Sequence, residues 1–161
     1  MPQLLVHPVF HSRDAFFDLA IRHRRVQTMI TMELSIPSVT TKDFPQTFAI
    51  LQKRLPSVLQ SQCFNEENIP FLLEVKTTEI GHLFEHILLE YLCELKLRQG
   101  YSNVVFSGIT NWNWYTDPRG TFHIKINAGF KDAGIFPEAI KKSVLLLQEI
   151  LEAKGKTPSS N

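Results

Sequence analysis

The sequence has few cysteines and no long apolar run, and each absence excludes a class of protein. Its 161 residues include two cysteines, Cys63 and Cys93, which form neither a CxxC pair nor a disulfide framework. A disulfide-stabilised secreted domain is therefore excluded, and we expect a protein of the reducing cytoplasm. No segment has the roughly eighteen consecutive apolar residues of a membrane-spanning helix. The first residues also lack the basic region and apolar run of a secretion signal.

The chain has no strong excess of charge of either sign. Seventeen lysines and arginines face sixteen aspartates and glutamates, which gives a net charge of +1. Such a protein has no field that would draw it to nucleic acid or to a membrane surface, so neither is an expected partner. The hydrophobic fraction of 43% and the charged fraction of 20% are typical of a soluble globular protein. We expect a single domain over residues 1–153, followed by a polar, disordered tail at 154–161.

Hydrophobic periodicity predicts both helices and strands. Residues 26–36 and 121–127 alternate between apolar and polar side chains, as half-buried strands do, and residues 117–120 form a turn before the second of them. Residues 103–108 are expected to be its partner strand, and residues 70–75 a short strand or extended stretch. The expected helices are 9–21, 42–59 with Asp43 as N-cap, 78–99 with Thr78 as cap and Gly100 as terminator, and 136–153. This order predicts an α+β fold, with an antiparallel-rich sheet and helices packed mainly on one face.

The central helix contains a His-x-x-Glu-His motif. At 100° per residue, His82 and His86 lie one turn apart on one face, with Glu85 beside them. Two neutral imidazoles at this spacing can bind one zinc ion, and a neighbouring glutamate can take a proton from water. The motif is that of the inverzincin peptidases. The alternative is a buried helix whose two histidines form hydrogen bonds to neighbours or solvent.

A catalytic zinc site needs a third protein ligand. The candidates are Glu90, Cys93, His123, Asp132 and Glu138. We select Glu138, because the first turns of the 78–99 and 136–153 helices would lie side by side if both helices ran parallel on one sheet face. The alternative role for Glu138 is that of a carboxylate placed against a helix dipole.

Two segments resemble a known family. The segments RLPSVLQSQC at 54–63 and TEIGHLFEHILLE at 78–90 are similar to the N-terminal domain of cyanophycin synthetases, and the hairpin segments FSGIT and GTFHIKIN match more loosely. The resemblance covers about residues 36–130. Gln62 stands where that family often has histidine, and these 161 residues do not include the ATP-grasp and ligase domains of a synthetase. We therefore do not expect this chain to join amino acids with ATP.

The resemblance implies an α+β domain that handles an aspartate–arginine polymer, and in some members a zinc site able to cut it. Carried over to this chain, it implies that His82 and His86 are zinc ligands and Glu85 is the general base. The first functional hypothesis is thus a zinc-dependent peptidase or amidohydrolase acting on that polymer or a related peptide.

Two further hypotheses require no catalysis. The chain can be a binding module for the polymer or a peptide, in which Trp112, Trp114, Tyr115 and Asp117 receive guanidinium groups by stacking and ion pairing. The segment that contains these aromatic residues is otherwise an exposed hairpin loop or a dimer contact. The third hypothesis is a structural subunit of a homo-oligomer.

Overall fold

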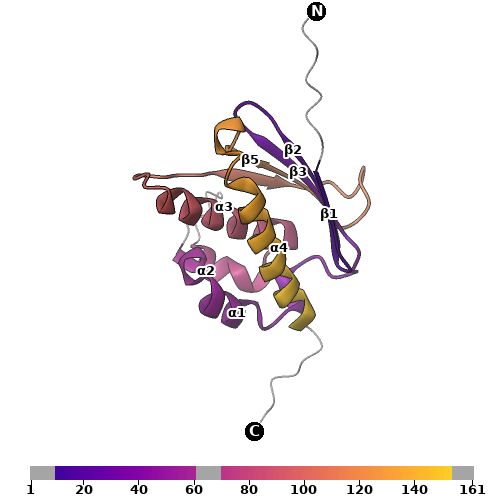
Figure 1. Cartoon of the computed structure of the whole chain (residues 1–161). Helices are drawn as coiled ribbons and strands as arrows, with labels where there is room; N and C mark the ends of the chain where they lie inside the picture. The colour runs from indigo at the N-terminus through magenta and orange to yellow at the C-terminus, as the bar shows by residue number, and fades with distance from the viewer. Residues whose placement is uncertain (1–9, 61–69, 154–161) are drawn as a thin grey trace, which may run out of the picture.

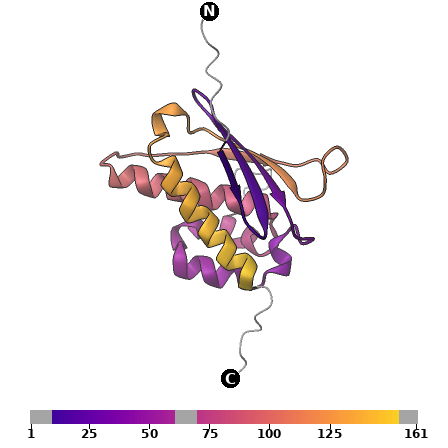
Figure 2. The same ribbon diagram turned by 45° about the vertical axis from the view of Figure 1, so that its right-hand side comes forward.

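The computed structural model describes residues 10–60 and 70–153, which form a five-stranded sheet and four α-helices. The strands are β1 (Phe10–Arg13), β2 (Phe17–His23), β3 (Thr28–Leu34), β4 (Gly108–Asn111) and β5 (Thr121–Ile126). The helices are α1 (Thr47–Arg54), α2 (Phe71–Glu74), α3 (Ile80–Arg98) and α4 (Phe136–Glu152). Figures 1 and 2 show α3 and α4 against one face of the sheet, with α1 and α2 farther from it. The predicted α+β fold is confirmed.

The sheet has the strand order β1-β2-β3-β5-β4, and every neighbouring pair is antiparallel. The alternation that predicted β3 and β5 corresponds to burial of one face. That face contributes a set of fully or nearly fully buried side chains, namely Phe17, Leu19, Ile21, Ile30, Met32, Phe122, Ile124 and Ile126. Helix α3 packs on this apolar face and buries Leu83, Ile87 and Leu88 completely.

The amino-terminal region is a β-hairpin, and the prediction of a helix over residues 9–21 is wrong. Strands β1 and β2 pair from Phe10↔Ile21 to Arg13↔Asp18. The Asp14 carboxylate turns the chain between them, because its Oδ1 accepts hydrogen bonds from the backbone N–H groups of Phe16 and Phe17 at 2.7 and 2.8 Å. The apolar residues of this region are buried at every second position, which is the period of a strand.

The predicted helix over residues 42–59 is divided by prolines. A 3₁₀ turn at Thr41–Asp43 precedes α1, and a second turn at Pro56–Gln60 follows it. Asp43 is not the N-cap of α1, since the N-cap position is Gln46. At the other end, Leu55 leaves the helical region with φ −150° and ψ 62°, as is common for a residue before proline.

Two predicted extended segments also differ from the structure. The predicted extended stretch at 70–75 is instead helical: Pro70 is the N-cap residue of α2, and a 3₁₀ turn at Val75–Thr77 follows the helix. Residues 103–107 are irregular, and Asn103 has a left-handed φ of 55°. The hairpin partner of β5 is therefore β4, which begins at Gly108. The predicted hairpin thus forms, but with residues 108–111 in place of the predicted strand at 103–108.

The predicted 78–99 and 136–153 helices are confirmed as α3 and α4. Gly100 follows α3 with φ +92°, a conformation that side chains rarely adopt, and it ends the helix as predicted. None of the helices in residues 10–60 and 70–153 combines the length and apolarity needed to cross a bilayer. The predicted tail at 154–161 lies outside the described residues.

Candidate functional site

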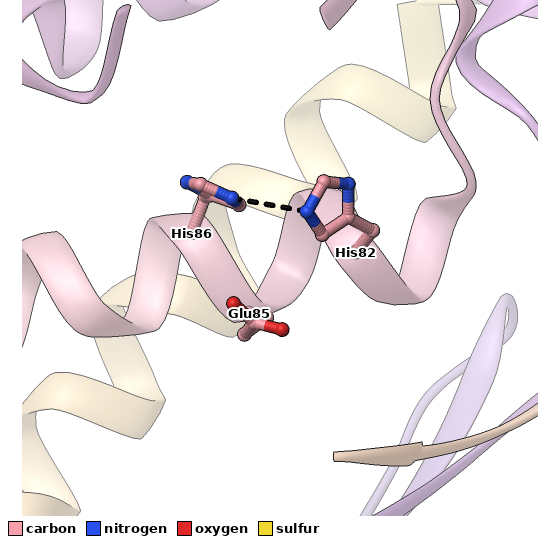
Figure 3. A group of neighbouring side chains, drawn as sticks. All are labelled: His82, Glu85 and His86. Atoms are coloured by element: carbon pink, nitrogen blue, oxygen red, sulfur yellow. Dashed lines mark hydrogen bonds between the residues drawn. The ribbon is translucent and has the colours of Figure 1, made fainter. Parts of the chain in front are cut away.

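The two histidines of the motif face each other across one turn of α3. The Nε2 atoms of His82 and His86 lie 3.1 Å apart. Glu85 comes from the same turn, and one ligand atom from each of the three residues lies within 4.8 Å of the others. Figure 3 shows the imidazole edges directed at one another, with the carboxylate farther round the helix. The sequence spacing thus predicts the proximity of these three groups correctly.

Contacts with α2 and with the residues before α3 fix the imidazole rings. Phe71, which is completely buried, stacks on His86 with ring centroids 4.0 Å apart and an interplanar angle of 10°. The same phenyl ring meets His82 nearly edge-on at 5.9 Å. Thr78 Oγ1 lies 2.7 Å from His82 Nδ1, and the Thr78 backbone N–H donates to Thr41 Oγ1. Thr78 therefore positions His82 rather than capping α3, whose N-cap residue is Glu79.

Burial keeps both histidines neutral. It lowers the pKa of His82, and it lowers the pKa of His86 to about 3, with a smaller contribution from the repulsion that a protonated His82 would exert on a second positive charge. A neutral imidazole has one unprotonated nitrogen, and this is the form that binds a metal.

Glu85 is a buried carboxyl group held by the sheet edge. Its side chain is 4% exposed, and Thr110 Oγ1 of β4 donates a 2.7 Å hydrogen bond to its Oε1. Burial raises the pKa of Glu85 to about 7, although the Thr110 hydrogen bond opposes this shift. A carboxyl group with this pKa exchanges its proton readily near neutral pH.

Gly108 makes room for that carboxyl group. A Cβ atom at this position would lie 3.2 Å from Glu85 Cγ and 3.0 Å from the Lys125 carbonyl oxygen. Gly108 and Thr110 are two residues apart on β4, so both face α3. Neither residue is predicted from the sequence as part of the site, because the segment FSGIT suggested only a strand. The only local feature of the sequence that could have pointed to them is a glycine and a hydroxyl residue at alternate positions of the expected strand.

The three groups line a cavity of about 560 Å³ between the start of α3 and the 105–112 segment. Its wall contains three carboxylate residues, Glu74, Glu79 and Glu85, and no lysine or arginine among the described residues. The apolar part of the wall is formed by Leu89, Val105, Phe106, Ile109 and Trp112. An apolar cavity with a few converging polar groups is the usual form of a small-molecule or peptide site.

Glu138 does not lie with the histidines, and the geometric premise for choosing it is wrong. Its carboxylate is 3.8 Å from Lys142 on α4, and the Lys142 ammonium lies over the Tyr91 ring at 5.7 Å. The start of α4 thus packs beside the later turns of α3, away from His82. A buried pair between Lys96 and Asp132, 2.7 Å apart, ties the residues before α4 to the end of α3. The first turns of the two helices are therefore not neighbours.

The four predicted substrate-binding residues differ in whether they border the cavity. Trp112 lines the cavity and is 39% exposed, whereas Tyr115 is fully exposed. Trp114 Nε1 donates to the Thr121 carbonyl, and the Arg119 guanidinium lies over its ring at 5.1 Å. Asp117 Oδ2 is 2.9 Å from His123 Nε2. The rings of Trp112 and Trp114 lie together, with centroids 6.3 Å apart, but Trp112 alone of the four borders the cavity.

Comparison with known proteins supports the resemblance drawn from the sequence. A family model described as "Cyanophycin synthase-like N-terminal domain" matches residues 29–152. The match includes all of the described helices, strands β3 to β5 and the candidate site. No curated protein matches the chain.

Proposed function

This chain belongs to the family of cyanophycin synthase-like N-terminal domains, and we propose that it is a zinc-dependent hydrolase of an aspartate–arginine polymer or a related peptide. The observation that supports the proposal most directly is the separation of 3.1 Å between the His82 and His86 Nε2 atoms, beside the buried Glu85. Two ligands on a tetrahedral zinc ion, each about 2.0–2.1 Å from it, are about 3.3 Å apart. The histidine pair is thus close to the spacing that such an ion requires.

The donor set also fits zinc. His82 and His86 would hold the ion through Nε2, and Thr78 Oγ1 at His82 Nδ1 is the outer hydrogen bond that orients a ligating imidazole. Glu85 is the third group within reach among the described residues. When bound, zinc supplies a Lewis acid that makes water more acidic and polarises a carbonyl group.

Glu85 supplies the proton transfer in this proposal. Its Oε1 is held by Thr110, so Oε2 remains for exchange with water. The carboxylate accepts a proton from the water that attacks the scissile carbonyl carbon. The carboxylic acid then donates this proton to the nitrogen of the leaving amine, which restores the carboxylate. In the metal-free protein burial raises the pKa of Glu85 to about 7, and a bound cation would favour the carboxylate form that accepts the first proton.

The cavity wall favours a cationic substrate. Besides Glu85 at the metal, it contains Glu74 and Glu79 and no lysine or arginine among the described residues that line it, so a guanidinium group would find complementary charge at these two carboxyl groups. Trp112 at the rim offers a ring on which a guanidinium group can stack. An arginine-containing polymer, to which the family points, meets both features.

Metal analysis and two active-site variants test this function. The purified protein should bind about one zinc ion per chain, and His86→Ala should lose it, since one of two histidine ligands is removed. His123→Ala, at a histidine outside the cavity, is the matched control and should retain the metal.

Glu85→Gln should keep the zinc yet lose cleavage of the aspartate–arginine polymer by at least about a hundredfold, whereas Glu90→Gln should cleave normally. Wild-type protein that binds no zinc and leaves the polymer intact would refute the proposal.

A non-catalytic binding module is the second candidate. The observation that favours it is that the described residues bring only His82, Glu85 and His86 together. A catalytic zinc site needs three protein ligands and a separate general base, so one group is missing from this cluster. Tight polymer binding with no cleavage by the zinc-loaded protein would support this candidate. Trp112→Ala should then weaken binding, with Tyr115→Ala as the exposed aromatic control. The cytoplasmic location and the homo-oligomeric state stay predictions from the sequence.

A further inference from the structure

We propose that the free edge of β4 binds an extended substrate backbone as an additional antiparallel or parallel strand, and so lays it across the His82–Glu85–His86 site. The inference rests on the proposed function, because it concerns how the same cavity holds its substrate. Its starting point is that β4 ends the sheet order, with β5 as its one strand neighbour among the described residues.

The hydrogen-bond pattern shows which groups of β4 face outward. The Asn127 backbone N–H donates to the Ser107 carbonyl at 3.0 Å, which makes this a hydrogen-bonded pair. Opposed residues in an antiparallel ladder alternate between bonded and non-bonded pairs. In the register Gly108↔Ile126 to Asn111↔His123, Ile109 and Asn111 therefore bond to β5. The N–H and C=O groups of Gly108 and Thr110 point away from β5, toward the free edge.

The same two residues face the reacting groups. Thr110 donates its hydroxyl hydrogen bond to Glu85, and Gly108 lies against the Glu85 methylene groups. Gly108 and Thr110 also line the cavity together with both histidines. A peptide bonded to the main chain of these two residues would thus run directly beside Glu85.

Apart from its short length of four residues, β4 lacks the sequence features that usually protect an exposed strand. Its sequence GITN contains no charge and no proline, and Gly108, Ile109 and Asn111 are exposed. Main-chain hydrogen bonds to such an edge give affinity, while pockets for alternate side chains give specificity. Every second side chain of the bound strand would face the carboxylate-lined cavity, so the cavity would select a cationic group at alternate positions.

Amide hydrogen exchange on the Glu85→Gln variant tests this geometry without turnover. The probe is a short, soluble oligomer of the aspartate–arginine polymer, added to the zinc-supplemented full chain. At about 90% occupancy, exchange at the Gly108 and Thr110 amides should slow about tenfold, because each gains a hydrogen bond to the oligomer. The Ile109 and Asn111 amides already bond to β5 and serve as internal controls that should not change. Binding that leaves Gly108 and Thr110 unprotected, or no binding at millimolar oligomer, would overturn the inference.

Backbone N-methylation of the oligomer provides a second, independent measurement. Methylation removes one N–H donor at a time. If the oligomer binds as a strand, methylation at every second position should weaken its affinity at least about tenfold, and methylation at the positions between should have little effect. Uniform sensitivity would contradict a bound strand. If the alternation appears but the wild-type protein neither binds zinc nor cleaves, the hydrolase proposal fails and the edge site stands. If zinc and cleavage are found without alternation, the edge site alone fails.

Discussion

Glu85 and His86 are neighbours in the chain, and burial moves their pKa values in opposite directions. The pKa of Glu85 rises from 4.5 to about 7, so the folded protein binds its proton more tightly than the unfolded chain between these values. The pKa of His86 falls from 6.5 to about 3, so the folded protein resists protonation there. Stability therefore falls above pH 4.5 because of Glu85 and falls below pH 6.5 because of His86. Between pH 4.5 and 6.5 both costs are present, whereas above this interval only the cost of Glu85 remains and below it only the cost of His86.

Replacing Glu85 with glutamine should remove the loss of stability at high pH. Glutamine stays neutral and still accepts the Thr110 hydrogen bond. In metal-free protein, Glu85→Gln should raise the free energy of unfolding at pH 8 by up to about 3 kcal/mol over wild type, since each pKa unit corresponds to about 1.36 kcal/mol. At pH 4 the two proteins should be equally stable. Urea unfolding with a chelator present measures both values, and Glu90→Gln controls for loss of a charge on the same helix. An equal effect of Glu85→Gln at both pH values would contradict the burial account.

Leu88 and His82 should contribute very differently to stability. Leu88 is completely buried under the sheet, so Leu88→Ala should lower the free energy of unfolding by about 2–5 kcal/mol through lost burial and a cavity. His82 is partly exposed at the cavity wall, and its replacement by alanine removes contacts with Thr78, Phe71 and His86 but leaves no cavity deep in the core. Denaturant melts in chelator give the comparison. A larger loss for His82→Ala than for Leu88→Ala would identify His82 as a structural core residue.

At the scale of the elements, strong periodicity over a long segment predicted structure well. Strands β3 and β5 and helices α3 and α4 all follow from alternation or from a helical stripe. The amino-terminal hairpin did not, because Phe16 and Phe17 are adjacent and hide the alternation of the residues that follow. The short helix α2 also escaped prediction, since four residues are too few for a period to appear.

The candidate site was predictable only where it lies within one element. The i, i+4 spacing placed His82 beside His86 because helix geometry alone fixes that distance. Phe71, Thr110 and Gly108 come from other segments, and their places depend on how α2 and β4 pack against α3. Glu138 was misplaced for the same reason. Its position depends on the direction in which α4 crosses α3, which periodicity does not encode.

The packing of α3 on the sheet requires a glycine in its first turn. A Cβ atom on Gly81 would lie 2.3 Å from the ring of Phe122 on β5, which is completely buried. Gly81→Ala should therefore lower the free energy of unfolding by about 1–3 kcal/mol from overpacking, even though alanine gains about 1 kcal/mol of helix propensity. Gly134→Ala, where a Cβ would meet nothing within 4 Å, is the control and should be near neutral. Thermal or urea melts that show Gly81→Ala as stable as wild type would mean that α3 shifts freely on the sheet.

At the scale of the whole molecule, the site is a junction between layers. Helix α3 carries the motif, the sheet edge holds Glu85, and α2 supports the histidine rings from the side away from the sheet (Figure 1). Residues from 71 to 112 thus converge on a site that neither layer could form alone. A metal bound at this junction would link the helical layer to the sheet, so its binding free energy should appear in the stability of the whole fold.

Zinc should therefore raise the melting temperature of the wild-type protein. A ligand that binds only the folded state adds about 4 kcal/mol at a concentration one thousand times its Kd. For a domain of this size, each kcal/mol shifts the Tm by about 2–4 °C, so a rise of about 8–16 °C is expected. Because a chelator removes the ion, the rise should be reversible, and His86→Ala should show none of it. His123→Ala should respond as the wild type does, since it leaves both Nε2 atoms of the α3 pair in place. Differential scanning calorimetry with and without zinc makes the comparison, and an equal response of His86→Ala and the wild type would place the metal elsewhere on the molecule.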